Sequence, residues 1–177
     1  FLDEQAIAQA VKEGRVVATS GPFVRFYANS DDNGPGSELS TTDTVTLHIE
    51  VQTPDWFDVR RVELYENGTL IREWTDEADE VLLDAGYNLV AEHDVAPDQD
   101  SWYAVVALGD DDLAPVFTPV EIAPIQLEDV VSGALSGLGG LFATLLEPGV
   151  PVPRTFPTHP YAVTNPIWVD ADASGDW

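Results

Sequence analysis

The sequence contains no cysteine and no methionine among its 177 residues. Without cysteine, neither a disulfide framework nor a thiolate metal site can form, and the redox compartment is not indicated. The chain begins with Phe1 rather than methionine, so we expect a removed leader, a proteolytic cut or an upstream domain before it. Stability must come from an apolar core, and a 44% content of apolar residues in a chain of domain length is enough for one.

Basic residues are also scarce. Seven lysines and arginines stand against 32 aspartates and glutamates, which gives a formal net charge of −25, and Lys12 is the only lysine. This charge repels phosphate backbones and anionic lipids, so it argues against nucleic-acid and membrane-surface partners. It suits a saline or cation-rich environment in which counterions screen the carboxylates. Most of the acidic residues are expected to form a solvated surface.

Few residues could form a catalytic centre. The histidines His48, His93 and His159 are far apart and lack the H-x-H or H-E-x-x-H spacings of hydrolytic metal sites. The segment GALSGLGG around Ser136 lacks the spacing of a G-x-S-x-G nucleophile elbow and the lysine of a phosphate-binding loop. We therefore assign no catalytic residue to this chain.

Short segments in which apolar and polar residues alternate make up much of the sequence. Residues 44–51, TVTLHIEV, alternate apolar and polar positions as a half-buried strand does. In residues 59–74, Asn67 and Gly68 separate two such runs, which predicts a type I′ hairpin. Further strands are predicted at 80–84, 87–95 and 101–108. Many short strands without alternating helices predict a mainly β fold, an antiparallel Ig-like β-sandwich.

Two helical segments are predicted beside the strands. Asp3 is placed to cap the first helix and Gly14 to end it. The second segment, 125–147, has apolar residues at helical spacing and seventeen uncharged residues from 130 to 146. Its glycines and acidic flanks favour a packed helix or helical hairpin over a membrane span.

Proline marks the boundaries along the chain. Gly21-Pro22 interrupts a β-rich run and predicts a bend or a switch of strand. We predict a leading helix, a β-sandwich, an apolar helical insertion, a proline-rich tether, and a final strand with an acidic tail: residues 1–14, 15–124, 125–147, 148–160 and 161–177.

The acidic tail is the best candidate for a metal site. Asp170, Asp172, Ser174 and Asp176 offer oxygen atoms at every second residue, and Gly175 allows a sharp turn. This is the first half of a D-x-D-x-[DNS]-G calcium loop, although the closing acid of such a loop would fall beyond the last residue. The pattern predicts a calcium site, with a solvated or frayed terminus as the alternative.

Aromatic residues suggest a second kind of site. Trp56, Tyr65, Trp74 and Trp102 lie in or beside predicted strands, and a row of exposed rings could stack on sugars. Sandwich cores also bury tryptophan, so packing in the core is the simpler interpretation.

Several sequence segments resemble those of one enzyme family. The segment AIAQAVKEGRVVATSGPFVRF is similar to the stretch that follows the catalytic core in PHP-domain metal-dependent hydrolases of the CehA/McbA, or carbaryl-hydrolase, type. VTLHIEVQTPDWFDVRRVELYENG, DSWYAVVALG and YAVTNPIWVDADASGD follow in the order expected for the C-terminal β-domain of that family. The resemblance covers nearly the whole chain except about residues 125 to 155.

The resemblance implies an accessory domain rather than an enzyme. The metal cluster of such a hydrolase would lie before Phe1, and none of its ligand motifs maps onto this chain. The expected function is a non-catalytic C-terminal domain that packs on the catalytic domain of a secreted or periplasmic hydrolase acting on ester or phosphoester-like bonds. The expected contact residues are Ile7, Val11, Leu135, Leu138 and Phe142.

Two alternatives remain open. One is a calcium-stabilised structural or adhesive module that self-assembles into oligomers through the same apolar residues. The other is a carbohydrate-binding sandwich that uses the tryptophans.

Overall fold

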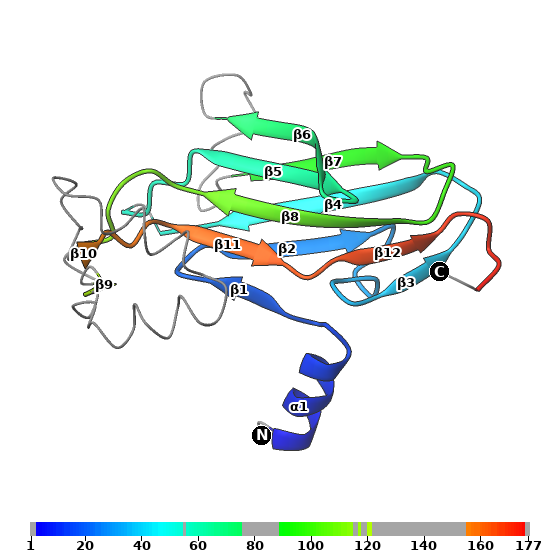
Figure 1. The fold of residues 1–177 in the computed structure, drawn as a ribbon, viewed down its shortest axis with the longest axis horizontal. Helices are drawn as coiled ribbons and strands as arrows, with labels where there is room; N and C mark the ends of the chain where they lie inside the picture. Colours follow the sequence, from blue (N-terminus) through cyan, green and yellow to red (C-terminus); the bar gives the residue numbers. More distant parts are fainter. Residues whose placement is uncertain are drawn as a thin grey trace, which may run out of the picture. The chain divides into compact units, whose positions relative to one another are not determined.

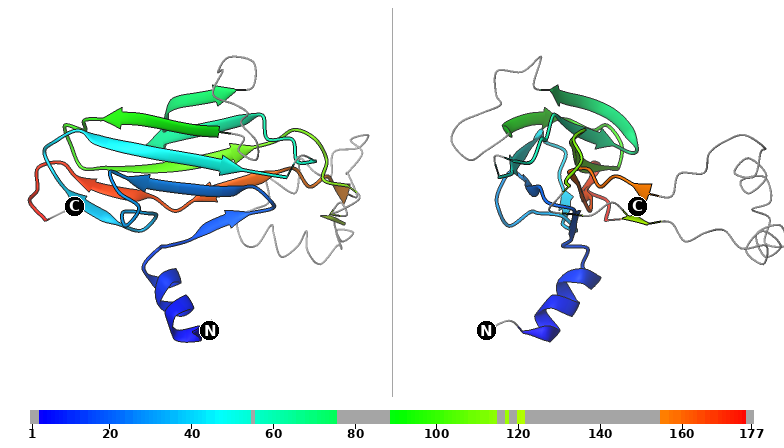
Figure 2. Two further views of the ribbon diagram at one scale, coloured as in Figure 1. Left: turned by 180° about the vertical axis from the view of Figure 1, so that it is seen from behind. Right: turned by 90° about the vertical axis from the view of Figure 1, so that its left-hand side faces the viewer.

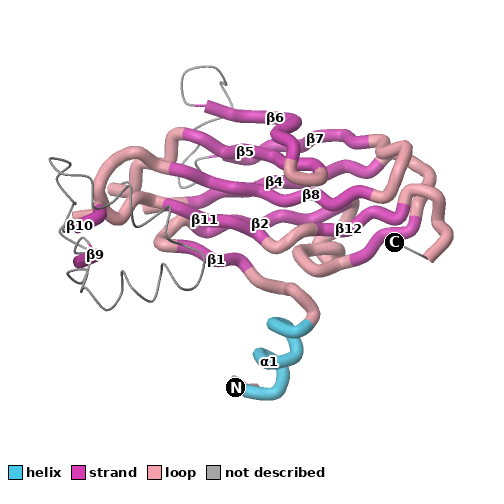
Figure 3. Tube along the Cα trace, in the orientation of Figure 1, coloured by secondary structure: helices cyan, strands magenta, loops and turns pink. Residues whose placement is uncertain are grey.

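The structure, a computed structural model, describes residues 3–54, 56–75, 89–114, 117, 120–121 and 155–175. The chain divides into two units, Phe1–Asp112 with His159–Trp177, and Leu113–Thr158. The described part of the chain is mainly β, with antiparallel sheets and one short helix, as the sequence predicts (Figures 1 and 3).

The first unit holds the helix and ten strands among the described residues. In chain order they are α1 (Glu4–Lys12), β1 (Val17–Thr19), β2 (Phe23–Ala28), β3 (Glu38–Ser40), β4 (Val45–Gln52), β5 (Arg61–Glu66), β6 (Thr69–Thr75), β7 (Leu89–Val95), β8 (Ser101–Leu108), β11 (Tyr161–Thr164) and β12 (Ile167–Asp170).

Strand β8 organises the larger of two sheets. One side of β8 pairs with β5, which in turn pairs with β6. The other side pairs with β11 and β12, which lie end to end along it. β1 pairs with β11 and β3 pairs with β12 at the outer edge (Figure 1). The larger sheet therefore has the order β6-β5-β8, then β11 with β12, then β1 with β3.

The smaller sheet contains β2, β4 and β7 in that order, and it faces the larger sheet across a single core (Figure 2). The alternation predicted for residues 44–51 is present, because the odd positions of β4 are fully buried and the even ones partly exposed. Fully or almost fully buried side chains come from both sheets, and the largest include Leu47, Ile49, Leu64, Leu89, Tyr103 and Ile167. Their burial is the main source of stability in a chain without cysteine.

Local sequence signals account for the ends of several elements. The carboxylate of Asp3 accepts a hydrogen bond from the backbone N–H of Gln5 at 3.0 Å, and Gly14 ends the helical region with φ of 73°. At the hairpin between β5 and β6, Asn67 and Gly68 have φ of 49° and 80°, as a type I′ turn requires. Both predictions are confirmed.

The interruption at Gly21-Pro22 is a switch between sheets. The chain leaves β1 in the larger sheet at Thr19 and enters β2 in the smaller sheet at Phe23. Proline lacks a backbone N–H, so a ladder ends there readily. Gly21 is required by packing as well, because a methyl group on it would lie 1.7 Å from the ring of Phe57.

The structure differs from the predicted final strand. Asn165 and Pro166 divide the run 161–170 into β11 and β12, and the N–H of Asn165 donates to the carbonyl oxygen of Val16 at 3.0 Å. β12 also pairs in parallel with β3, a strand of three residues for which the sequence analysis above predicts no strand. One parallel pair thus joins an otherwise antiparallel sheet.

The second unit is described only in part. Its β9 (Val120–Glu121) and β10 (Thr155–Phe156) form an antiparallel pair. The predicted insertion at 125–147 lies outside the described residues, as do residues 148–154 of the predicted tether.

Candidate functional site

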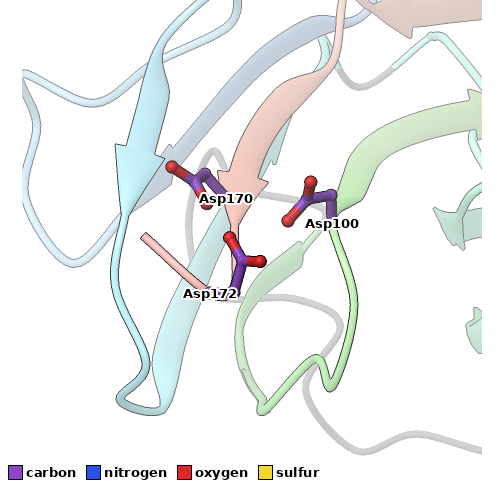
Figure 4. A group of neighbouring side chains, drawn as sticks. All are labelled: Asp100, Asp170 and Asp172. Carbon is purple, nitrogen blue, oxygen red and sulfur yellow. The ribbon is translucent and has the colours of Figure 1, made fainter. Parts of the chain in front are cut away.

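Three carboxylates meet where the acidic tail begins. Asp170 is the last residue of β12, Asp172 follows it, and Asp100 immediately precedes β8. One carboxylate oxygen from each of the three lies within 4.8 Å of the other two (Figure 4). Because β12 and β8 are paired, the tail and the β7–β8 loop are brought to the same place.

The tail folds back over Asp170. Its Oδ1 accepts the N–H of Ser174 at 3.1 Å, and its Oδ2 accepts the N–H of Gly175 at 2.8 Å. The hydroxyl of Ser40 on β3 donates to the same Oδ2 at 2.9 Å. These contacts leave Asp170 only 2% exposed, although it lies on the outer side of the sheet.

The other two carboxylates are held in a similar way. Oδ1 of Asp172 accepts the N–H of Ser174 at 2.9 Å, and Oδ1 of Asp100 accepts the N–H of Ala171 at 3.0 Å. The tail is therefore a turn closed by hydrogen bonds from its own backbone to its own acids, with Asp100 added from a distant loop.

Two opposing effects act on the ionisation of Asp170. Burial disfavours the charged form, while hydrogen bonds from Gly175, Ser40 and Ser174 favour it. The hydrogen bonds prevail, and the pKa of Asp170 is lower than its ordinary value. The group is an anion at neutral pH and contributes one fixed negative charge to the cluster.

The cluster fits calcium in charge and in ligand type. Calcium takes six to eight oxygen ligands at about 2.3–2.6 Å, so ligand atoms that share one ion lie within about 5 Å of each other. Three carboxylates at the observed spacing meet this condition and would supply part of that set. The hydrogen bonds within the tail also account for the arrangement without an ion.

The predicted tail ligands are brought together only in part. Asp170 and Asp172 take part in the cluster, and Ser174 contributes its backbone N–H to both. Asp176 lies outside the described residues. Asp100 was missed, because seventy residues separate it from Asp170 and only the pairing of β8 with β12 makes them neighbours.

The three histidines do not converge. His48 on β4 stacks on Tyr27 with ring centroids 4.6 Å apart, and its Nδ1 lies 3.1 Å from a carboxylate oxygen of Glu92. His93 on β7 lies edge-on to Trp74 at 6.4 Å, and Nδ1 of His159 lies 3.3 Å from the carbonyl oxygen of Asp111. His48 pairs in register with Glu92, so it points to the face opposite to that of His93.

The proposed row of aromatic rings is not formed by the four residues named from the sequence. Trp74 is 4% exposed and belongs to the core, as the simpler interpretation of the tryptophans predicted. Trp56 is 59% exposed in the segment after β4, where its ring contacts Phe57. Trp102 on β8 instead has Trp168 on β12 as its partner in register.

The residues predicted to form an interface fall in two parts of the chain. Ile7 and Val11 on α1 are 50% and 60% exposed, and α1 has no buried residue. Leu135, Leu138 and Phe142 lie outside the described residues.

Comparison with protein-family models, curated proteins and solved structures gave no match to this chain. Within the part of the chain that the structure describes, no helix has the length and apolarity needed to cross a membrane.

Proposed function

We propose that this chain is a non-catalytic accessory β-sandwich, the C-terminal domain of a PHP-type metal-dependent hydrolase. The exposed apolar side of α1 carries this proposal. Ile7 and Val11 lie one turn apart on the first helix, and more than half of Val11 is exposed. Apolar side chains placed together on a helix surface are typical of a contact with another domain.

Strand order supports an Ig-like arrangement within the sandwich. The smaller sheet places β4 between β2 and β7, and the larger places β8 between β5 and the divided strand β11 and β12. The chain crosses between the sheets after β4, after β6 and after β7, as expected for a Greek-key sandwich.

The position of α1 suggests its partner. It is the first described element, so a domain that precedes this chain would lie next to it in sequence. The C-terminal end of the helix is attached to the sandwich, because the Cα of Gly36 packs against the backbone of Glu13 and Gly14. The exposed side is then held at a defined orientation, and packing against the catalytic domain would bury it.

Sedimentation velocity tests this proposal directly. The chain is mixed with the polypeptide encoded immediately before Phe1, and complex formation is expected for the natural sequence. Ile7→Glu and Val11→Glu should weaken the complex, because each places a charge in the apolar contact. Val90→Glu is the matched control, since Val90 is 51% exposed on β7 in the smaller sheet. Full association of the Ile7→Glu variant, or an upstream polypeptide without metal-binding histidine motifs, would contradict the proposal.

Calcium binding by the tail stays a prediction. Thermal unfolding in calcium and in excess chelator is the measurement, with a higher midpoint expected in calcium because a ligand that binds only the folded state stabilises it. Asp100→Asn and Asp172→Asn should remove the difference. Equal midpoints for the natural sequence in both solutions would contradict a calcium site.

Self-assembly is the alternative that uses the same apolar residues. A structural or adhesive module would sediment as an oligomer by itself, and the oligomer would dissociate in the Ile7→Glu variant. A monomer at all concentrations would exclude this alternative.

A further inference from the structure

A groove of about 530 Å³ lies between the C-terminal end of α1 and the β3–β12 edge of the larger sheet. It is lined by Lys12, Glu13, Gly14, Gly36, Glu38, Asn165, Pro166 and Trp168. These residues come from three separate parts of the chain.

The walls of the groove are held by backbone contacts. A methyl group on Gly36 would lie 2.0 Å from the carbonyl oxygen of Glu13, so only glycine allows the helix end to approach this closely. The N–H of Gly36 donates to the carbonyl oxygen of Pro166 at 2.8 Å, which fixes the loop before β3 against the start of β12. The groove is thus part of the folded sandwich and not a gap beside a loose helix.

One wall is aromatic. Ile167 and Val169 point into the core, so Trp168 points to the outer side of the sheet, where it is half-buried. Trp168 pairs in register with Glu38 on β3 and with Trp102 on β8. Residues opposite each other on adjacent strands have Cβ atoms about 5 Å apart, so the two tryptophans start from neighbouring positions on the same face of the sheet.

The other lining side chains are polar and open. Lys12, Glu38 and Asn165 are exposed, and within the described residues their side chains form no ion pair or hydrogen bond. Together they offer an ammonium donor, a carboxylate that can accept two hydrogen bonds, and an amide that can donate and accept. A ligand with several hydroxyl groups would satisfy all three.

We propose that this groove binds a neutral saccharide chain. A pyranose ring has an apolar face that stacks on tryptophan and a hydroxyl-bearing rim that binds carboxylate, amide and ammonium groups. Trp168 and Pro166 would contact the apolar face of one ring, and Glu38, Asn165 and Lys12 its hydroxyls. Trp102 would take the next ring of the chain.

Charge selects against acidic sugars. The chain carries a formal net charge of −25, and Glu13 and Glu38 lie in the groove itself. Uronates and sulfated sugars would be repelled, whereas a neutral chain carries no such cost. This inference does not depend on the resemblance to hydrolases, and it can hold or fail independently of it.

Titration calorimetry on the full 177-residue chain tests the proposal. The probes are cellohexaose, laminarihexaose, maltohexaose and chitohexaose, with a galacturonate oligomer of the same length as the acidic comparison. Binding of at least one neutral oligosaccharide and none of the acidic one is expected. Trp168→Ala should lower the association constant about tenfold or more, which corresponds to the loss of one aromatic stacking contact.

Matched variants separate binding from folding. Glu38→Gln and Lys12→Gln change exposed groups, so they should keep the thermal midpoint while they weaken binding several-fold. Trp56→Ala removes an equally large exposed ring elsewhere and should leave binding unchanged. The proposal is overturned if no neutral oligosaccharide binds at millimolar concentration. It is also overturned if Glu38→Gln and Lys12→Gln bind as the natural chain does, or if Trp56→Ala alone abolishes binding.

Discussion

The outer faces of the two sheets carry different kinds of contacts although both sheets share one core. The outer face of the smaller sheet carries charged and polar residues that pair with each other across strands, beside the exposed apolar Phe23 and Val90 at its ends. The outer face of the larger sheet carries Trp102 and Trp168 side by side, together with half-buried Val106 and Val163.

Interactions on the smaller sheet form a chain across its three strands. Arg25 on β2 lies 2.5 Å from the carboxylate of Asp31 and 3.4 Å from that of Glu50 on β4. Its guanidinium also lies over the ring of Tyr27, which stacks on His48. These polar groups already have partners within the protein. A ligand would only replace those hydrogen bonds and ion pairs with similar ones, so the net binding free energy would be small.

The outer face of the larger sheet is better suited to binding a ligand. Burying a partly exposed tryptophan ring against a ligand contributes favourable binding free energy, and tryptophans are enriched where proteins bind ligands or partners. The comparison therefore directs functional tests to β8 and β12, and it makes the smaller sheet the natural source of control substitutions.

The largest expected effect concerns the core that the two sheets share. Ile49→Ala in the smaller sheet and Leu64→Ala in the larger should each lower the free energy of unfolding by about 2–5 kcal/mol. Both side chains are fully buried in the same cluster, so the two losses should be similar. Urea denaturation measures them, and a change below about 0.5 kcal/mol for either would contradict a single shared core.

Gly36→Ala should have the next largest effect, at about 1–3 kcal/mol. Its φ of 84° is unfavourable for alanine, and the new methyl group would meet the backbone of Glu13. Gly175→Ala is the control, because Gly175 has a φ of 77° and nothing within 4 Å of the new methyl group. If both variants lower the free energy of unfolding by the same amount, the close approach of α1 to the sheet does not contribute to stability.

Removing the charge of Asp170 should alter the stability at acid pH. Its pKa is lowered in the folded state, so its contribution is present above the ordinary aspartate pKa and is lost as the pH falls through the lower folded value. Asp170→Asn should therefore be less stable at neutral pH, and it should lose less stability as the pH falls below the ordinary aspartate pKa. Ser40→Ala should move the acid transition to higher pH, because it removes one hydrogen bond to the carboxylate. Thermal midpoints measured from neutral to acid pH test both variants. If the natural sequence, Asp170→Asn and Ser40→Ala give parallel profiles, the hydrogen-bonded carboxylate of Asp170 does not contribute to the acid transition.

The smallest effect is expected on the polar outer face. His48→Ala removes a ring stacked on Tyr27 and a contact with Glu92, and such cross-strand pairs contribute about 0.2–1 kcal/mol. Oligosaccharide binding should not change. Loss of binding in this variant would mean that the two outer faces do not have the separate roles inferred from them.

Part of the fold could be predicted because its signals are local. The cap at Asp3, the hairpin turn at Asn67 and Gly68, and the alternation in β4 each depend on residues only a few positions apart. β3 could not be predicted, since three residues carry too short a pattern and its partner lies 130 positions away along the chain. Division of the final strand also escaped notice, because it depends on Asn165 bonding to Val16.

The candidate sites were less predictable because they combine residues that lie far apart in the sequence. Asp170 and Asp172 were named from their spacing, whereas Asp100 joins them only through the pairing of β8 with β12. Trp102 was named for an aromatic surface, but its true neighbour is Trp168, and Trp74 belongs to the core. Alternation shows that a side chain lies on one face of a strand, yet it does not show which strand lies beside it.

By itself, the sequence determined the class of the protein: a β-rich chain stabilised by an apolar core, strongly acidic, with a capped leading helix and a turn-forming acidic tail. These properties follow from composition and from neighbouring residues, whose preferences act over a few positions. Only the tertiary structure decided which faces became polar or aromatic and which distant residues line one groove. Strand pairing joins segments more than a hundred residues apart, and no local preference encodes that choice.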